Sequence, residues 1–302
     1  IMLQGFKSTD PTKVLRISAN NLDADLLNYL LRYKEFNLRG TMSGDVIVSY
    51  ESEVPKFASD FSVDSLWINN DYVGNVFLES NWDIVSSQVE LKVEIKRREL
   101  SMLTAEGTYY PDSTGHLDFD LHFNRFRLMW IDPFVAGILE NIRGTVSGDI
   151  KITGTFKDIV TNGELTLGNT ALGVPYLATD YSFEGKPIIR VLHNRLELPS
   201  TIIRDTKEGT TGTIVGNATH NNFMDWKLDL KIETQNLLVL ATENSEDAYF
   251  YGKGYAAGEF TLIGPVEDLA INIDITTNKG TDFKIPFSNP VNVGAQSFIT
   301  YT

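Results

Sequence analysis

The chain has 302 residues, of which 42% are hydrophobic and 22% are charged, with a formal net charge of −14 and no cysteine. This composition excludes a disordered chain, a disulfide scaffold and thiolate chemistry. The negative charge argues against a protein that wraps nucleic acid or adheres to an anionic bilayer through a basic patch.

The chain carries no visible signal peptide, and no apolar run approaches the ~20 residues that span a bilayer as a helix. It begins at Ile1 and stops in the middle of a strand pattern at Thr302. We therefore expect it to be a piece of a longer protein.

Alternation of apolar and polar residues recurs along nearly the whole chain. In the run 117–123, for example, every second residue is apolar and the residues between are Asp118, Asp120 and His122. Successive side chains of a strand point to opposite faces, so each run predicts a strand with one apolar and one polar face. We therefore expect an all-β protein with one large apolar face. The residues expected to line this apolar face are Val89, Leu91, Val93, Ile95, Leu117, Phe119, Leu121, Phe123, Ile150, Ile152, Trp226, Leu228, Leu230, Ile232, Leu269, Ile271, Ile273 and Ile275.

Short helices are expected between some of these strands. Leu22, Leu26, Leu27, Leu30 and Leu31 form an apolar stripe at helical spacing, which predicts a helix near Leu22–Leu31. A second helix is predicted over Phe134–Ile142, because Asp132 suits the cap and Pro133 suits the first helical position. The polar segment Leu237–Phe250 is as compatible with a loop as with a helix.

Three glycine motifs divide the chain into units of about a hundred residues. They begin at Gly40, Gly144 and Gly252, and a Leu-rich alternating strand precedes each of them. The motifs predict internal repeats over approximately 15–116, 117–225 and 226–302, the last one partial, within one continuous body over residues 1–302. We interpret their glycines as turn residues that permit unusual backbone angles.

Candidate catalytic, metal and cofactor sites are weak. Asp118, Asp120 and His122 share one face of a strand but spread over roughly 13 Å, too far for one metal ion. Gly252, Gly254 and Gly258 are followed by a strand pattern, whereas a dinucleotide fingerprint needs a helix there. No nucleophile elbow is present, and Trp67, Trp82, Trp130 and Trp226 are interpreted as core or rim residues. We expect no enzyme, no catalytic residue, no metal and no cofactor.

The apolar face leaves two structures open. It can be a closed core packed against a second sheet, or the lining of a folded-over sheet with an open seam. Composition alone favours the closed core.

The order of the glycine motifs, the Leu-x-Leu-x-Leu strands and the element Asn278–Phe287 after the final Ile-rich strand resembles the TamB family. This translocation and assembly module family belongs to the AsmA-like group of bridge-type lipid transfer proteins, and the resemblance is closest to the versions in Bacteroidota. It covers essentially the whole chain and implies a long antiparallel sheet curled into a half-pipe, or β-taco, with a hydrophobic interior and short helices between repeats. It therefore favours the open seam.

The resemblance also implies a function and a location. The expected function is a periplasmic bridge that carries phospholipid acyl chains along a hydrophobic groove between inner and outer membrane. The inner-membrane anchor and the contact with an Omp85-class barrel of the TamA or BamA kind are expected outside this fragment. One alternative is a chaperone-like factor that presents sheet edges to outer-membrane β-barrel proteins or autotransporters. Another is a closed β-sandwich binding module.

Overall fold

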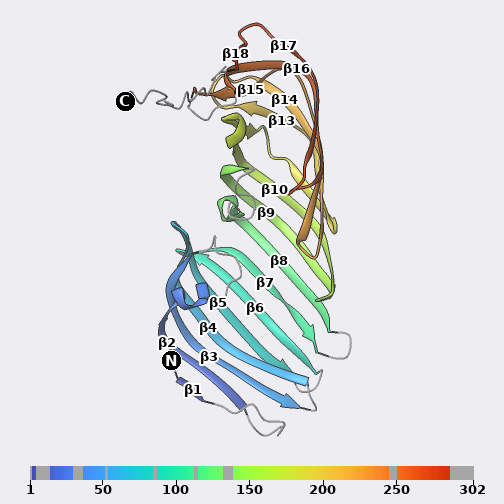
Figure 1. Ribbon diagram of the computed structural model, residues 1–302. Helices are drawn as coiled ribbons and strands as arrows, with labels where there is room; N and C mark the ends of the chain where they lie inside the picture. Colours follow the sequence, from blue (N-terminus) through green and yellow to red (C-terminus); the bar gives the residue numbers. More distant parts are fainter. Residues whose placement is uncertain are drawn as a thin grey trace, which may run out of the picture.

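The structure is a computed structural model (Figure 1) that describes residues 2–4, 14–29, 37–51, 54–83, 87–111, 115–131, 139–244 and 250–285. Strands make up most of these residues, as the alternating pattern predicts. They are β1 (Met2–Gln4), β2 (Val14–Asp23), β3 (Leu38–Glu51), β4 (Val54–Ile68), β5 (Asp71–Asp83), β6 (Gln88–Arg97), β7 (Leu100–Tyr110), β8 (His116–Arg127), β9 (Glu140–Thr155), β10 (Asp158–Val174), β11 (Thr179–Phe183), β12 (Ile188–His193), β13 (Arg195–Asp205), β14 (Thr211–Asn221), β15 (Met224–Thr242), β16 (Tyr251–Pro265), β17 (Ala270–Thr277) and β18 (Asp282–Lys284).

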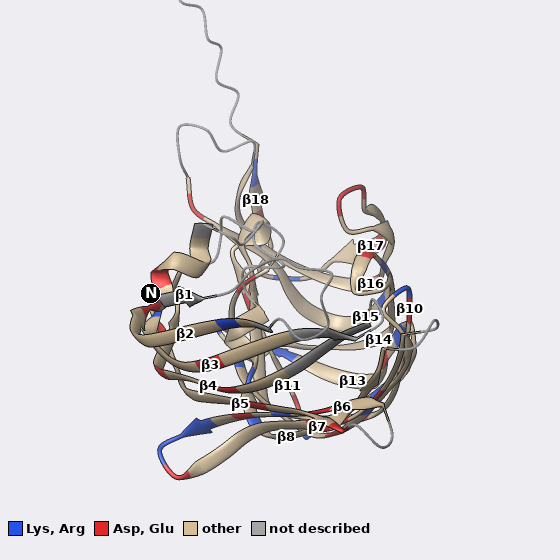
Figure 2. Cartoon of the chain, turned by 90° about the horizontal axis from the view of Figure 1, so that it is seen from below, with Lys and Arg blue, Asp and Glu red and all other residues tan. Residues whose placement is uncertain are grey.

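All described strands belong to one 18-stranded antiparallel sheet. From β2 to β10 each strand pairs with the next in the chain. The short strands β11 and β12 both pair with β10 on one side and with β13 on the other. The strands stack along the long axis of the molecule (Figure 1), and the sheet curls around an interior when seen along that axis (Figure 2). The fold is therefore the expected curled antiparallel sheet.

Tight turns hold this meander together. The β14–β15 turn has Asn222 and Phe223 at φ 48° and 63°, as a two-residue hairpin of the favoured twist requires. Asn222 also ties this turn to the β9–β10 turn, since its side chain donates to Lys157 O at 2.7 Å and accepts from Ile159 N at 3.1 Å. Turns that are far apart in the sequence are thereby fixed to one another.

Helical structure in the described residues is limited to three 3-10 segments, η1 (Ala24–Tyr29), η2 (Leu128–Ile131) and η3 (Pro175–Leu177). Of the helix expected near Leu22–Leu31, the structure shows the 3-10 segment η1, and the prediction is wrong at its start, because Leu22 belongs to β2. Residues 30 and 31 lie outside the described residues. No described helix has the length and apolarity to cross a membrane.

The prediction of a helix over Phe134–Ile142 is wrong at its end. Ile142 lies in β9, where it is buried and follows the same two-residue period as Val146 and Ile150. Residues 134–138 fall outside the described residues. The loop or helix expected over Leu237–Phe250 is also wrong at its start, because β15 continues to Thr242 and buries Leu237, while residues 245–249 are not described.

The glycines of the three motifs lie inside strands and not in turns. Gly44 in β3, Gly148 in β9 and Gly258 in β16 have φ of 132°, 146° and 137°. A Cβ atom at each would lie 2.1–2.2 Å from a backbone carbonyl of the next strand. The prediction of unusual backbone angles is confirmed, and the reason is the close approach of neighbouring strands.

The most buried cluster is small and lies where β11, β13 and β15 come together. Tyr181, Ile203 and Leu237 form its centre. Val174, Phe183, Ile214, Ile232 and Val239 pack against them. The remaining buried hydrophobic residues are scattered along the sheet, as expected for a curled single layer.

Candidate functional site: the apolar face of the sheet

The register of the sheet arranges the apolar face in rows that cross the strands. Residues that face each other on neighbouring strands lie on the same side of a sheet. Val93 pairs with Ala105, Ala105 with Leu121, and Leu121 with Ile150. Every position of this first row, from β2 to β16, is an apolar residue or a glycine. The row is Ala19, Gly44, Phe61, Leu78, Val93, Ala105, Leu121, Ile150, Gly163, Val191, Leu196, Ala218, Leu228 and Gly264.

A second apolar row runs beside the first from β2 to β12. It contains the expected residues Ile95 and Phe123, which both pair with Leu103. Again no position carries a polar side chain. The row is Leu22, Met42, Val63, Val76, Ile95, Leu103, Phe123, Gly148, Leu165 and Ile189.

A third row, on the other side of the first, joins the expected residues Leu91, Phe119 and Ile152 through Gly107. It also contains hydroxyl groups. Ser59 and Ser80 hydrogen-bond to each other at 2.8 Å, and Thr161 donates to His193 O at 2.5 Å. The polar groups of this row are therefore satisfied within the sheet. Val89 and Leu117 form a further row through Tyr109.

The expected residues of the C-terminal third also share one face. Leu230 and Ile271 flank Leu262, and Ile232 and Ile273 flank Phe260. Ile275 pairs with Gly258. Leu269 lies just before β17. Trp226 lies beside the β14–β15 turn, where its Nε1 donates to Phe223 O at 3.0 Å.

Exposure differs along this face. Val89, Leu117 and Ile150 are buried, whereas Leu91, Phe119, Leu121, Leu228 and Leu230 are only partly buried. On β17, Ile271 and Ile273 are 58% and 59% exposed. All described strands belong to the same sheet, so a core closed by a separate second sheet does not form within the described part of the chain.

The opposite face of the sheet, here called the outer face, carries ion pairs. Lys92 contacts Glu106 at 2.6 Å, and its hydrogen bond with this carboxylate raises the pKa of Lys92. Lys151 contacts Asp118 and, at 3.0 Å, Asp120, while His122 Nδ1 lies 2.7 Å from Asp149 Oδ1. Asp118, Asp120 and His122 are thus engaged in pairs between neighbouring strands. No cluster of three metal-ligating side chains occurs among the described residues.

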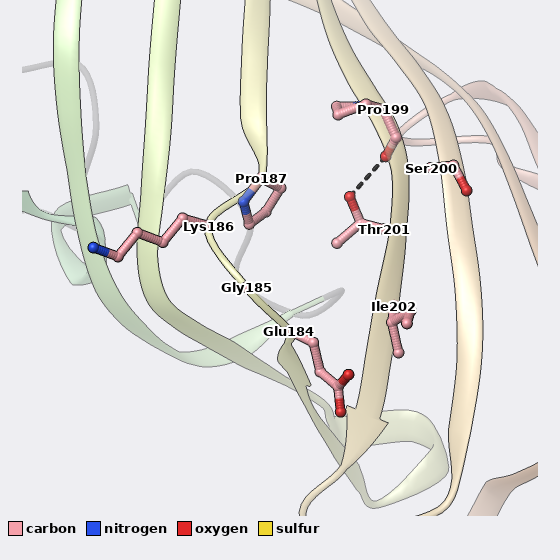
Figure 3. Close-up of a pocket in the computed structure, with 8 residues that line it drawn as sticks. All are labelled: Glu184, Gly185, Lys186, Pro187, Pro199, Ser200, Thr201 and Ile202. Carbon is pink, nitrogen blue, oxygen red and sulfur yellow. Dashed lines mark hydrogen bonds between the residues drawn. The ribbon is translucent and has the colours of Figure 1, made fainter.

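A break in the sheet interrupts the second row between Ile189 and Leu198. Strand β12 pairs with β13 only from Arg190 to Leu192. Beyond this point Pro187 and Pro199 lack the N–H that a ladder needs. A hollow of about 440 Å³ opens there, where Pro187 and Thr201 point toward each other and Thr201 donates to Pro199 O at 2.7 Å (Figure 3). The first row bypasses the break through Val191 and Leu196.

Sequence reasoning missed several members of the rows, such as Phe61, Leu78 and Val191. Strands β4 and β5 carry Ser, Asn or Gly between the apolar residues, and β12 has apolar residues at consecutive positions, so the alternation is weaker there. The only signal that reveals them is the register itself.

Comparison with known proteins identifies the end of the chain. Residues 200–301 match the model of the TamB C-terminal domain. This segment includes most of β13 and all of β14–β18, with the exposed isoleucines of β17. No curated protein and no solved structure gives a significant match.

Proposed function

We propose that this chain is a protein of the TamB type, because its residues 200–301 match the TamB C-terminal domain, and that it forms part of a bridge for phospholipid acyl chains across the periplasm. The TamB family belongs to the periplasmic cell envelope and is linked to outer-membrane assembly. The proposal that this chain carries lipid between inner and outer membrane rests on its apolar face.

The observation that carries the proposal is the first row. It forms a path lined only by apolar side chains and glycines from β2 to β16. Neighbouring strands are ~4.8 Å apart, so such a row reaches several times the length of an acyl chain. A hydrocarbon tail on this row would pass from strand to strand without meeting a polar side chain.

The energetic benefit is large. An acyl chain loses roughly 0.8 kcal/mol per methylene when it enters water, so two chains of about sixteen carbons face a barrier on the order of 25 kcal/mol. An apolar groove removes most of this barrier because each site along it is nearly equivalent to the next. Transport of this kind requires continuity and no catalytic residue.

The charges of the outer face fit the same proposal. Ion pairs such as Lys92–Glu106 keep that side in water, while the partly buried Leu91 and Leu121 face the other way. We propose that the curled sheet encloses a groove lined by the eighteen residues named at the outset. We place the inner-membrane anchor and the contact with an Omp85-class barrel outside this chain.

Site-specific photo-crosslinking tests the proposal. A photoreactive residue at Leu91, Phe119 or Leu228 should capture phospholipid in cells, because these side chains lie on the apolar face. The matched controls are Glu90 and Asp229, which neighbour two of these positions and point to the outer face. Equal capture at both sets, or none at either, would overturn the groove.

A chaperone-like role is the second candidate, and β17 favours it. This strand pairs with β16 on one side, and every one of its residues is exposed. Its other edge pairs with no described strand and could receive a strand of a nascent outer-membrane protein by β-addition. Crosslinks from β17 to such proteins, without lipid capture at Leu91 or Leu228, would select this function.

A further inference from the structure

Arginine and aromatic side chains stack at one rim of the sheet, where β3 and β5 begin and β4 and β6 end. The guanidinium of Arg39 lies 5.6 Å from the ring centroid of Trp67, and Trp67 lies 5.2 Å from Tyr72. The guanidinium of Arg97 lies 5.6 Å from the Tyr72 ring. These four residues, here called the arginine–aromatic stack, come from four successive strands. Figure 1 shows these strands side by side.

Backbone contacts hold the stack in place. Asn69 in the β4–β5 turn donates its N–H to Asn37 O at 2.7 Å and accepts from Asn37 N at 2.9 Å through its side chain. Arg39 Nη2 donates to Asn69 O at 3.0 Å. The turn is thus tied to the start of β3, so Arg39 is held beside Trp67 before any ligand arrives.

Neither guanidinium of the stack forms an ion pair with a carboxylate of the described residues, although Asp64 and Asp71 lie close in sequence to Trp67 and Tyr72. Several other cations among the described residues are paired, as Arg143 is with Asp180 at 2.6 Å. Two unneutralised guanidinium groups on neighbouring aromatic rings, in a chain of net charge −14, form a local site for an anion.

The stack adjoins the apolar rows. Val63 and Val76 of the second row pair with each other. Along the same two strands the next pairs are Leu66 with Gly74 and then Trp67 with Tyr72. Trp67 is 36% exposed. A ligand with its tail on the second row would place its polar end at Trp67 and Tyr72, and such amphipathic rings suit a boundary between oil and water.

We infer that the arginine–aromatic stack binds the phosphate of an amphiphile whose acyl chains lie on the apolar face. Guanidinium groups present paired N–H donors that match phosphate oxygens, and stacking on aromatic rings leaves their edges free to donate. The inference rests on the proposed function and adds to it a head-group site on one rim. The same chemistry would also accept free phosphate, and the experiment separates the two sources.

Isothermal titration calorimetry on the 302-residue chain tests this inference with three probes. They are dihexanoylphosphatidylglycerol, inorganic phosphate, and dihexanoylglycerol, which has the same chains without phosphate. The test variant is Arg39→Gln with Arg97→Gln. The matched control is Arg16→Gln with Arg98→Gln, which removes two charges from exposed residues outside the stack. A third variant, Arg39→Lys with Arg97→Lys, keeps the charges and removes the planar groups.

The expected result is about a tenfold or greater loss of affinity for the phospholipid in the test variant and less than about twofold in the control. The loss of affinity in the lysine variant should lie between those of the test and control variants. Affinity for dihexanoylglycerol should not change in any variant, which also shows that the proteins remain folded.

Three results would overturn the head-group site. One is an equal loss in test and control variants, which means that only overall charge matters. Another is inorganic phosphate binding as tightly as the phospholipid, which assigns the stack to free phosphate. The third is an unchanged test variant. If wild-type protein binds neither dihexanoylglycerol nor the phospholipid, the groove itself fails, and that failure is distinguishable from the other three.

Discussion

The hydroxyl of Tyr181 in β11 donates a hydrogen bond to the backbone carbonyl of Leu238 in β15 at 2.8 Å, although these two strands are not neighbours in the sheet. The N–H of Leu238 in turn donates to Thr210 Oγ1 at 2.8 Å. The two backbone groups of this fully buried residue are therefore bonded to β11 and to the connection between β13 and β14. Burial raises the pKa of Tyr181 to about 12, so the hydroxyl remains a donor at all physiological pH values. This contact fixes the tight curl of the sheet at its most buried cluster.

Tyr181→Phe should destabilise this part of the sheet. The substitution keeps the ring and leaves the Leu238 carbonyl buried without its donor, which costs about 1–3 kcal/mol. Urea denaturation followed by circular dichroism measures the loss. Tyr176→Phe is the control, because Tyr176 is 69% exposed, and its effect should stay within about 0.5 kcal/mol. Equal stability of the two variants would show that the hydrogen bond does not hold the curl.

Gly148→Ala should lower the free energy of unfolding more than Tyr181→Phe does. A Cβ atom there would lie 2.1 Å from Glu164 O, and φ of 146° is strained for any L side chain. Overpacking and backbone strain together predict a loss of about 2–4 kcal/mol in the same denaturation experiment. Gly185→Asn is the control, since Gly185 has φ of 73° with open space around it. A neutral Gly148→Ala would mean that β9 and β10 can move apart freely.

The alternation of single residues predicted the strands and the apolar face well. Runs such as 89–95 and 117–123 carry a strict two-residue period, and the period fixes the face of each side chain as soon as the strand forms. The expected residues Val93, Leu121, Ile150 and Leu228 indeed fall in one row. The local pattern was enough to predict the strands and their faces, because one face of the sheet is apolar and the other is charged.

Register and longer contacts could not be read from the same pattern. The pairing of Gly163 with both Ile150 and Val191 depends on which strands become neighbours, and the break at Pro187 depends on a second proline in β13. Asp132 and Pro133 resemble a helix start and therefore predict a helix that reaches Ile142, whereas Ile142 lies in strand β9. The stack of Arg39 on Trp67 joins residues that no short-range rule connects.

Stability should depend on pH through His220. Its Nδ1 accepts a hydrogen bond from Phe223 N at 3.1 Å, which requires the neutral ring, and burial together with the nearby His193 lowers its pKa. A base with a lowered pKa in the folded state contributes stability above its ordinary pKa of about 6.5 and loses it as the pH falls below. The urea midpoint of the wild-type protein should therefore decline as the pH falls below about 6.5.

His220→Asn isolates this effect. Asparagine offers an acceptor near the same place and does not titrate, so the decline attributable to His220 should disappear. His116→Asn serves as the control, because His116 is exposed and its replacement should leave the decline unchanged. Identical pH profiles for wild type and His220→Asn would contradict the assignment.

Leu121→Asp tests the first row at its middle. Leu121 lies between Ala105 and Ile150, so a carboxylate there would face any acyl chain on the row and must be desolvated when one passes. We expect a modest loss of stability, about 1–3 kcal/mol, with the sheet retained and at least a tenfold drop (about 1.4 kcal/mol) in affinity for lipid. Native mass spectrometry of the purified chain measures bound phospholipid per protein.

Leu121→Ala keeps the row apolar and should retain lipid. Asn162→Asp adds the same charge on the outer face beside Lys151 and should also retain it. If Leu121→Asp carries as much lipid as Asn162→Asp, the acyl chains do not travel along this row.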